Sequence, residues 1–265
     1  MITHARQTGL SLVELMVALT IGLLIVLAAT TLYLGASGSL RLQDEVSRLD
    51  DSGRFALDSI TRLLRIAGYV DWAGDSGGAP VQLNPGDPPA VQGSDGARND
   101  ALTLRFFGSA NGGAADGAIV DCLGVPVPRD GNPASRSENS LSVSAGGALL
   151  CQASGMTSPQ PLIDGVDRLQ FLYGVDTDGD GIPDRWQRAG QVANWRAVRV
   201  VRVGLLMAGG PGSRKDLDTA VYRLFGAAHA DAGDNAVLDT ATLSDAERHR
   251  LRRLYTATVA IRNGG

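Results

Sequence analysis

The amino terminus of the chain carries one long apolar run. Residues 15–40 contain no charged side chain, and the positions 15–34 are nearly all apolar. Twenty residues of α-helix span about 30 Å, the thickness of the hydrocarbon core of a bilayer. The run is too long for the apolar region of a cleaved signal peptide, and no small-x-small cleavage site follows it. It therefore predicts a helix that anchors the chain in a membrane.

Beyond this run, apolar residues recur in steps of three and four, with one gap near Gly53. Such spacing places them on one face of a helix. They are Leu42, Val46, Leu49, Leu57, Ile60 and Leu64. The opposite face carries acidic and basic side chains in balance. We therefore expect one helix over residues 10–66, about 85 Å long, whose first half lies in lipid or a filament core and whose second half packs under a globular head.

The composition changes after Gly68, where a Gly- and Pro-rich connector over 71–100 leads into the head. Alternating apolar and polar residues then predict a series of strands. We place them at 101–107, 118–122, 140–144, 148–152, 169–173, 197–207, 222–225 and 254–262. A possible capping box, Ser244 to Glu247, predicts a short helix over 245–250. The expected fold class is α+β, a long amino-terminal helix packed on a mainly antiparallel sheet.

Overall composition argues for a binding or structural protein. The chain has 24 basic and 28 acidic residues, a net charge of −4, which argues against a strongly basic nucleic-acid binder. It holds three histidines, and no phosphate loop, dinucleotide fingerprint, HExxH or paired CxxC motif is present. Residues 74–80 resemble the nucleophile loop of chymotrypsin-like proteases, but the order of Ser76 and His229 is wrong for that family. We expect no enzyme activity and no catalytic residue.

The amino-terminal motif resembles the type IV prepilin signature. A short polar leader ends at Gly9, Leu10 begins the apolar stretch, and Glu14 follows. The resemblance implies that a prepilin peptidase cuts between Gly9 and Leu10 and methylates the new amino terminus. Leu10 stands where Phe is the commonest residue of the family. The implied organisation is a leader at 1–9, a transmembrane or filament-core helix half at 10–40, an amphipathic half at 41–68 and a head at 69–265.

Glu14 is the candidate assembly residue. A carboxylate among apolar residues is costly unless an opposite charge meets it. Processing would create such a charge, the amine of Leu10. A neighbouring subunit's amine could approach Glu14 in a filament, so we expect Glu14 to select the docking register.

The remainder of the chain resembles the PilW-type minor pilins. The stretches that carry this resemblance are 55–69, 169–186, 198–207 and 252–263. It implies a low-abundance subunit that helps to initiate the type IV pilus within a minor-pilin tip complex. The implied partners are other minor pilins, the major pilin, the prepilin peptidase and a large tip adhesin, with no direct contact to nucleic acid. The implied location is the bacterial inner membrane, with a single span and a periplasmic head, and then the extracellular pilus.

Two alternatives stay open. A minor pseudopilin of a type II secretion system would share the processing motif and the helix. A membrane-anchored, calcium-dependent adhesin would share the anchor alone. Twitching motility, DNA uptake and cell adhesion are all compatible with a type IV pilus subunit.

Cys122 and Cys151 are the only cysteines of the chain. The compartment beyond the inner membrane is oxidising in most Gram-negative bacteria, so the pair is expected to form a structural disulfide. Two buried free thiols are the alternative.

An acidic loop at 176–184 follows the order of an EF-hand calcium loop. The candidate Ca²⁺ ligands are Asp176, Asp178, Asp180, the carbonyl of Ile182 and Asp184. Gln187 stands where an EF-hand has a bidentate Glu, so weak affinity is expected. Because Asp and Gly favour turns, a solvated turn without metal is the alternative.

Overall fold

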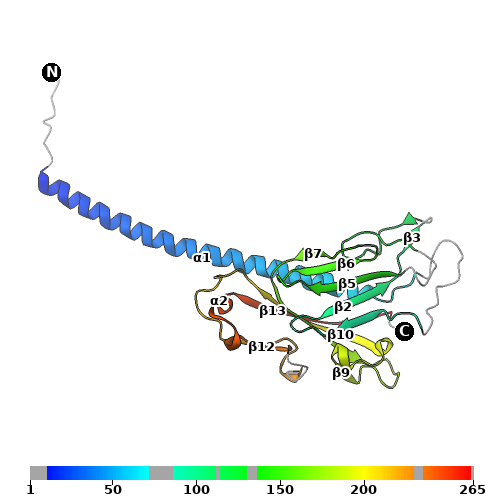
Figure 1. Ribbon diagram of the computed structural model, residues 1–265. Helices are drawn as coiled ribbons and strands as arrows, with labels where there is room; N and C mark the ends of the chain where they lie inside the picture. Colours follow the sequence, from blue (N-terminus) through cyan, green and yellow to red (C-terminus); the bar gives the residue numbers. More distant parts are fainter. Residues whose placement is uncertain (1–10, 72–85, 112–113, 130–135, 230–234, 264–265) are drawn as a thin grey trace. The chain divides into compact units, whose positions relative to one another are not determined.

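The computed structural model describes residues 11–71, 86–111, 114–129, 136–229 and 235–263. The chain divides into two compact units, Met1–Glu45 and Val46–Gly265. The helix α1, Leu12–Ile66, contributes to both units (Figure 1). The expected helix over 10–66 is therefore present from Leu12 onward, while Gly9 and Leu10 lie outside the described residues.

The described part of the second unit contains two larger antiparallel sheets (Figure 1) and two two-stranded ones, β3-β4 and β11-β12. The first has the order β1-β2-β5-β6-β7. Its strands are β1 Val91–Ser94, β2 Ala101–Phe106, β5 Ser137–Val143, β6 Leu149–Ala153 and β7 Gln160–Ile163. A separate two-residue ladder joins β3 Ala110–Asn111 to β4 Ala114–Ala115.

The second sheet has the order β13-β10-β8-β9. Its strands are β8 Val166–Val175, β9 Arg185–Gln187, β10 Val198–Ala208 and β13 Arg252–Ala260. Short 3₁₀ turns precede β10, at Ala189–Gln191 and Trp195–Ala197. The long connection from β10 to β13 holds β11 Val221–Arg223, β12 Val237–Asp239, α2 Asp245–Arg248 and the 3₁₀ turns Ala227–His229 and Thr240–Thr242. The Ser244 and Glu247 capping box is present at the start of α2.

One hydrophobic core joins the carboxy-terminal part of α1 to both sheets. The α1 side chains in it include Leu49, Ile60 and Leu64 from the expected stripe, and also Ala56 and Leu63. Both sheets contribute leucine, valine and phenylalanine side chains that are fully buried. The stripe beyond Val46 therefore does pack under a β-rich head, as the periodicity predicts, whereas Leu42 is 48% exposed and belongs to the first unit.

The gap in the stripe has a structural reason. Gly53 lies against the ring of Tyr255 from β13, and a Cβ at this position would overlap the ring atoms. The Tyr255 hydroxyl donates to Asp50 Oδ1 at 2.6 Å and to the carbonyl of Leu49 at 3.2 Å. The glycine therefore brings the helix close to the edge of the second sheet.

The expected strand at 118–122 is wrong. This stretch forms only an isolated bridge, between Val120 and Pro126. Its apolar side chains Ile119 and Cys122 are buried, so the alternating pattern reflects a buried loop. The other expected strands are present with shifted ends. No strand was expected in the segments that form β1, β3, β4, β7, β9 and β12.

Candidate assembly helix, acidic loop and disulfide

Ser11 caps the start of α1. Its Oγ accepts a hydrogen bond from the Glu14 N–H at 3.2 Å, which satisfies one of the free donors of the first turn. Glu14 is exposed and is the acidic residue of that turn. A carboxylate at this position interacts favourably with the positive end of the helix dipole. The local sequence thus starts the helix at Leu12 and places Glu14 in its first turn.

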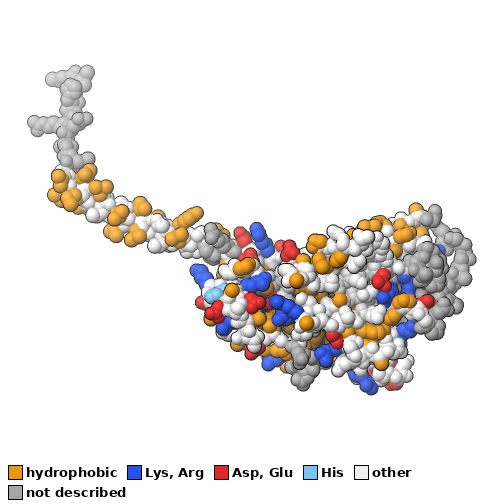
Figure 2. Space-filling model, viewed as in Figure 1, with side chains coloured by type: hydrophobic (Ala, Val, Ile, Leu, Met, Phe, Trp, Pro, Cys, Tyr) orange, Lys and Arg blue, Asp and Glu red, His pale blue; other side chains and the backbone are white. Residues whose placement is uncertain are grey.

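The first unit exposes an apolar helix surface (Figure 2). Leu12, Leu23 and Leu32 are each exposed by 74–75%. The hydroxyls of Thr20 and Thr30 donate to carbonyls one turn back, at 2.8 Å in both cases. These bonds satisfy the hydroxyls without water, as an apolar environment requires. Among the described residues, α1 is the one helix whose length and composition suffice to cross a membrane.

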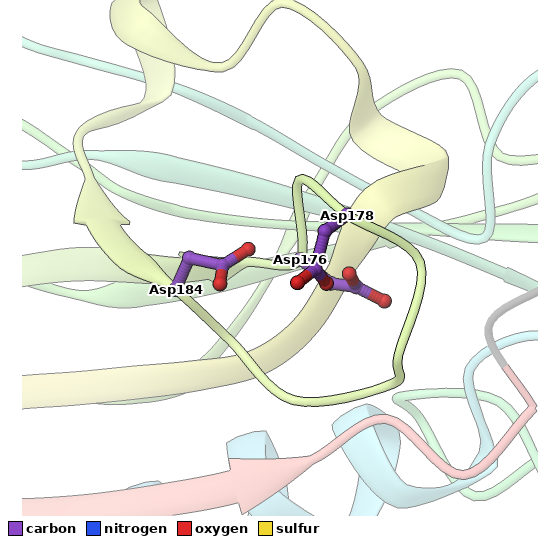
Figure 3. Close-up of side chains that lie close together, drawn as sticks. All are labelled: Asp176, Asp178 and Asp184. Carbon is purple, nitrogen blue, oxygen red and sulfur yellow. The ribbon is translucent and has the colours of Figure 1, made fainter.

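The acidic loop connects β8 to β9. It brings together Asp176, Asp178 and Asp184, each with a carboxylate oxygen within 4.8 Å of the others (Figure 3). Asp176 is buried, whereas Asp178 and Asp184 are exposed. The Asp184 carboxylate points toward that of Asp176 (Figure 3). This cluster could hold a metal ion, because carboxylate oxygens are the ligands that hard cations prefer.

Hydrogen bonds within the loop organise the buried carboxylate. Asp176 Oδ1 accepts the Gly179 N–H at 2.6 Å, and Oδ2 accepts the Gly181 N–H at 3.0 Å. Arg199 Nε on β10 donates to the same Oδ2 at 3.0 Å. Burial alone would raise the pKa of Asp176, but these hydrogen bonds and the Arg199 charge outweigh it and hold the pKa below its ordinary value. Asp176 is thus ionised and already balanced by one cation of the protein.

Two of the expected metal ligands, Asp180 and Asp184, accept hydrogen bonds from other residues of the loop. Asp180 lies outside the acidic cluster, and its Oδ1 accepts the Ile182 N–H at 2.7 Å. The Ile182 side chain is 65% exposed. Asp184 Oδ2 accepts the N–H and the hydroxyl of Thr177, at 2.6 and 2.7 Å, and these bonds lower the pKa of Asp184. Three of the four expected carboxylates, those of Asp176, Asp178 and Asp184, therefore form the cluster.

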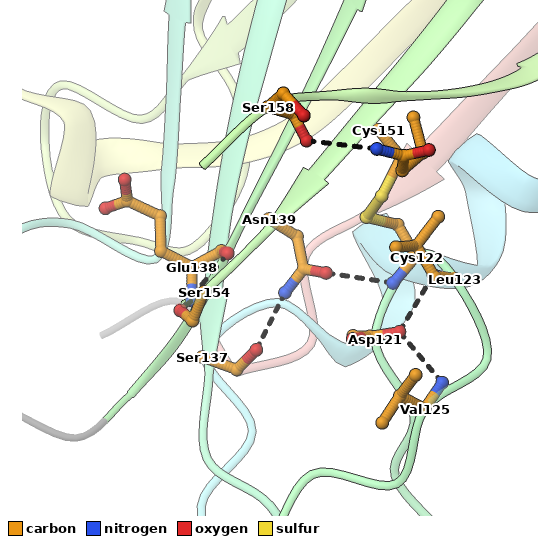
Figure 4. The surroundings of a disulfide bond; sticks show 11 residues. Asp121, Cys122, Leu123, Val125, Ser137, Glu138, Asn139, Cys151, Ser154 and Ser158 are labelled. Carbon is orange, nitrogen blue, oxygen red and sulfur yellow. Dashed lines mark hydrogen bonds between the residues drawn. A yellow bond between two sulfur atoms is a disulfide. The ribbon is translucent and has the colours of Figure 1, made fainter. Parts of the chain in front are cut away.

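Cys122 and Cys151 form a disulfide between a loop and β6 (Figure 4). Both residues are buried, and their Cα atoms are 6.1 Å apart. The Cys122 N–H donates to Asn139 Oδ1 at 2.9 Å, and Asn139 Nδ2 donates to Ser137 Oγ at 3.0 Å. The disulfide and the buried Asn139 therefore attach the loop before β5 to the first sheet.

Sequence reasoning did not identify a buried charge cluster around Arg252. The guanidinium of Arg252 lies 2.7 Å from Asp167 Oδ2 and 3.6 Å from Asp218 Oδ2, and all three side chains are 1% exposed. Arg98 and Arg168 also pair with Asp167. Burial would raise the pKa of Asp167, but the hydrogen bonds from Arg252 and Arg98 outweigh it, so the pKa is lowered. The cluster attaches the long β10–β13 connection to the second sheet.

The residues of the protease-like motif do not form a site in the described part of the chain. Ser76 lies outside the described residues. The His229 ring packs against Trp186, with centroids 5.8 Å apart. Burial and the nearby charge of Arg202 lower the pKa of His229.

Comparisons with known proteins agree with the amino-terminal motif and with the head. The family model "Prokaryotic N-terminal methylation motif" matches residues 4–30, and the model "Type IV Pilus-assembly protein W" matches residues 134–263. No curated protein sequence matches the chain. A type IV-like pilin from Thermus thermophilus is a structural neighbour, with 16% sequence identity, a TM-score of 0.45, and coverage of 84% of this chain and 96% of that one.

The family matches point to a structural component of the pilus, one that interacts with other pilins and with the pilus machinery. The methylation motif and the apolar helix fit a membrane-anchored pilin. The expected resemblance to PilW-type pilins, the α+β fold class and the Cys122–Cys151 disulfide are confirmed. Over residues 134–263 the chain is similar to the PilW-type pilins, and its amino terminus carries the methylation motif of type IV prepilins.

Proposed function

We propose that this chain is a minor pilin that helps to initiate type IV pilus assembly and is held in a minor-pilin complex at the tip. The apolar amino-terminal part of α1 supports this proposal most directly. Side chains all along residues 12–34 are exposed, so this surface needs lipid or other helices to cover it. The same surface serves first as an inner-membrane anchor with a periplasmic head and then as the contact with major and minor pilins in the extracellular pilus.

Processing precedes assembly in this proposal. The prepilin peptidase cuts between Gly9 and Leu10 and methylates the Leu10 amine. The new amine lies close in sequence to Glu14, whose carboxylate stands in the first turn of α1. Both charges would be costly among apolar helices unless they are paired. Pairing with the amine of a neighbouring subunit satisfies both only in the correct axial register.

Glu14→Ala tests this function. The substitution spares the apolar run, so we expect membrane insertion and cleavage to continue. It removes the carboxylate that pairs with the amine, so the processed protein should remain in the membrane and be depleted from sheared pili. The measurement is a blot of both fractions at equal expression. Glu45→Ala, a carboxylate on the same helix outside the apolar run, is the matched control. Equal recovery of Glu14→Ala in pili contradicts the proposed role.

The rival functions differ in where the protein is found. A minor pseudopilin of type II secretion would be cleaved after Gly9 but would be absent from type IV pili. A membrane-anchored adhesin would keep its amino-terminal residues, His4 and Arg6 among them. Amino-terminal sequencing of the protein from the membrane fraction identifies the uncleaved adhesin, and a blot of sheared pili separates the minor pilin from the pseudopilin. A large tip adhesin would be recovered in the pilus fraction if it is a partner.

We also propose that the acidic loop binds Ca²⁺ weakly. Its three clustered carboxylates are hard oxygen ligands, and Gly179 and Gly181 adopt positive φ angles of 86° and 87° that permit the tight loop. Arg199 competes for Asp176, and position 187 offers Gln in place of a bidentate Glu. Both features weaken the binding, so we expect a millimolar dissociation constant for Ca²⁺.

A further inference from the structure

We propose that the open edge of β13 binds an extended, acidic polypeptide segment of a partner protein by strand addition. The partner is defined by chemistry: a β-strand with carboxylate side chains on one face. The segment would extend the second sheet and would place a carboxylate against Arg202 and Arg223. Within the proposed function, this edge would contact another pilus protein.

The outward-facing groups of β13 follow from its pairing with β10. The ladder runs without a register shift and is flanked by two hydrogen bonds, from the Gly209 N–H to the Leu251 carbonyl at 2.8 Å and from the Ile261 N–H to the Arg199 carbonyl at 2.7 Å. Backbone groups alternate in direction along an antiparallel strand. Odd-numbered residues of β13 therefore bond to β10, and even-numbered residues direct their N–H and C=O to the open edge.

This edge differs from the other sheet edges of the described structure. The terminal strands β1, β7 and β9 have three or four residues, whereas β13 has nine. Residues 254–260 include no charged residue, proline or glycine, the features that usually protect an edge from pairing. By contrast, side chains cover part of the β8 edge: Asn99 Oδ1 and Asp100 Oδ2 accept the N–H groups of Leu169 and Phe171 at 2.8 and 2.9 Å.

A basic groove adjoins the open edge. Its volume is about 470 Å³, and its lining includes Leu254, Thr256 and Thr258 of β13 together with Arg202 and Arg223. Ala257 of β13 also lines the groove. Leu254, Thr256 and Thr258 are even-numbered, so the residues that direct their backbone groups to the open edge also line the groove. The groove lies on the sheet face opposite α1, because odd-numbered Tyr255 is the residue that contacts the helix.

The charge of the groove selects the partner. No acidic residue lines it, and neither Arg202 nor Arg223 forms an ion pair within the described part of the chain. Arg202 is held in place: its guanidinium lies 4.5 Å from the ring centroid of Trp186, and its Nε donates to Thr258 Oγ1 at 3.3 Å. A positioned arginine with free N–H groups suits a carboxylate. A second copy of this chain would instead oppose arginine to arginine.

Peptide binding to the full-length protein in detergent tests the proposal without requiring pilus assembly. The probe is a fluorescein-labelled peptide of nine residues, the length of β13, in which Val alternates with Glu and Thr. We expect saturable binding by fluorescence anisotropy. Exchanging Glu for Lys, or the central Val for Pro, should weaken binding by about tenfold or more. Equal affinity of the three peptides overturns strand addition of an acidic segment.

Variants of the edge separate backbone pairing from side-chain contact. Thr256→Pro removes an outward N–H and leaves the β10 ladder intact, as edge strands tolerate, so it should lower affinity by about tenfold, whereas Thr256→Val should retain it. Arg223→Gln should weaken binding severalfold and reduce its salt dependence. Arg65→Gln, an exposed arginine on α1, is the charge control. Unchanged binding in Thr256→Pro and Arg223→Gln, with unfolding transitions like that of the wild type, refutes the proposal.

Two further outcomes are decisive. A concentration-dependent dimer that Thr256→Pro abolishes would assign the edge to a second copy of this chain and overturn the proposal. If the protein binds the peptide but is absent from pili, the proposed minor-pilin function is rejected and strand addition at the β13 edge is supported. If the protein is recovered in pili but does not bind the peptide, the minor-pilin function stands and strand addition is rejected.

Discussion

The Tyr255 ring lies against Gly53, and its hydroxyl donates to the Asp50 carboxylate one turn earlier on α1. Two residues separated by two hundred positions in the chain thus set the distance between helix and sheet. Glycine is unfavourable in a helix interior by about 1 kcal/mol relative to alanine. The close approach of the ring outweighs that cost.

Gly53→Ala should therefore destabilise the head, although alanine is the better helix former. The new methyl group overlaps the Tyr255 ring, and moving the ring breaks its bond to Asp50. We expect a loss of about 1–3 kcal/mol in the free energy of unfolding, measured with urea. Gly35→Ala is the control, because no atom lies within 4 Å of its added Cβ. A gain in stability for Gly53→Ala would show that the ring moves without cost.

Arg252 and Arg253 are neighbours with opposite environments, so they form a matched pair. Arg252→Gln leaves the buried carboxylates of Asp167 and Asp218 poorly compensated and should cost about 3–5 kcal/mol. Arg253→Gln breaks an ion pair to Asp50 whose arginine is 49% exposed and should cost at most about 1 kcal/mol. Chemical denaturation of both variants at pH 7 gives the comparison. Similar losses would mean that the buried cluster contributes no more than a surface pair.

Asp100 should give the head a pH dependence opposite in sign to that of Asp167. Burial raises the pKa of Asp100 to about 6. Its contribution to stability is therefore fully present below the unfolded value of 3.8 and is lost as the pH rises through about 6. Asp167, with a lowered pKa, contributes stability above 3.8 that is lost as the pH falls below it.

Between pH 4.5 and 7, the contribution of Asp100 to the free energy of unfolding can be measured separately from that of Asp167. Asp100→Asn cannot ionise, so its unfolding free energy should depend less on pH across this window than that of the wild type. The difference between the two proteins should change by about 2–3 kcal/mol. Asp95→Asn is the comparison, because the Asp95 carboxylate also accepts backbone N–H groups but is exposed, whereas Asp100 is buried. Parallel pH profiles for wild type and Asp100→Asn would contradict the assignment.

The acidic loop should respond to Ca²⁺ through the cluster that the structure shows. A ligand that binds only the folded state stabilises it by mass action, so 10 mM Ca²⁺ at a millimolar site should add about 1–1.5 kcal/mol and raise Tm. Asp178→Asn combined with Asp184→Asn should abolish the response, and Asp180→Asn should retain it. If Asp180→Asn also abolishes the response to Ca²⁺, Asp180 is a metal ligand, as the EF-hand order predicts. A flat calorimetric titration of the wild type would favour the metal-free turn.

The disulfide should stabilise the head by restricting the unfolded chain. The two cysteines are 29 positions apart, and closing such a loop contributes about 3–4 kcal/mol in the chain-entropy model. Cys122→Ala with Cys151→Ala should show a loss of that order, and adding reductant should affect the wild type alone. Two alkylatable thiols in natively folded periplasmic protein would refute the disulfide.

The sequence predicts α1 and much of the second sheet because their apolar residues repeat with a clear period. The expected strand at 118–122 fails because the burial of Ile119 and Cys122 comes from a disulfide-linked loop, which imitates strand alternation. The β1 strand was not predicted because it lies within the Pro- and Gly-rich connector over 71–100, whose composition indicates a loop. Local patterns cannot show the Arg252 cluster, whose partner Asp167 lies 85 positions away.

The spacing of the acidic loop correctly indicates a cluster of carboxylates, of which Asp176, Asp178 and Asp184 lie within 4.8 Å of one another. Turn formation and metal binding both favour Asp and Gly at these positions. The structure assigns Asp180 to the backbone of the turn, a choice that depends on three-dimensional hydrogen bonding. In the same way, the contact between Gly53 and Tyr255 cannot be predicted from the local sequence, because the two residues meet only in the folded chain.

The disulfide also closes a covalent ring of backbone between Cys122 and Cys151. A single peptide-bond cleavage anywhere within that ring opens it without separating the polypeptide into two molecules. A nicked head would therefore migrate as one species in a non-reducing gel and as two fragments after reduction. Proteolytic damage in this segment leaves the subunit covalently attached to its anchor.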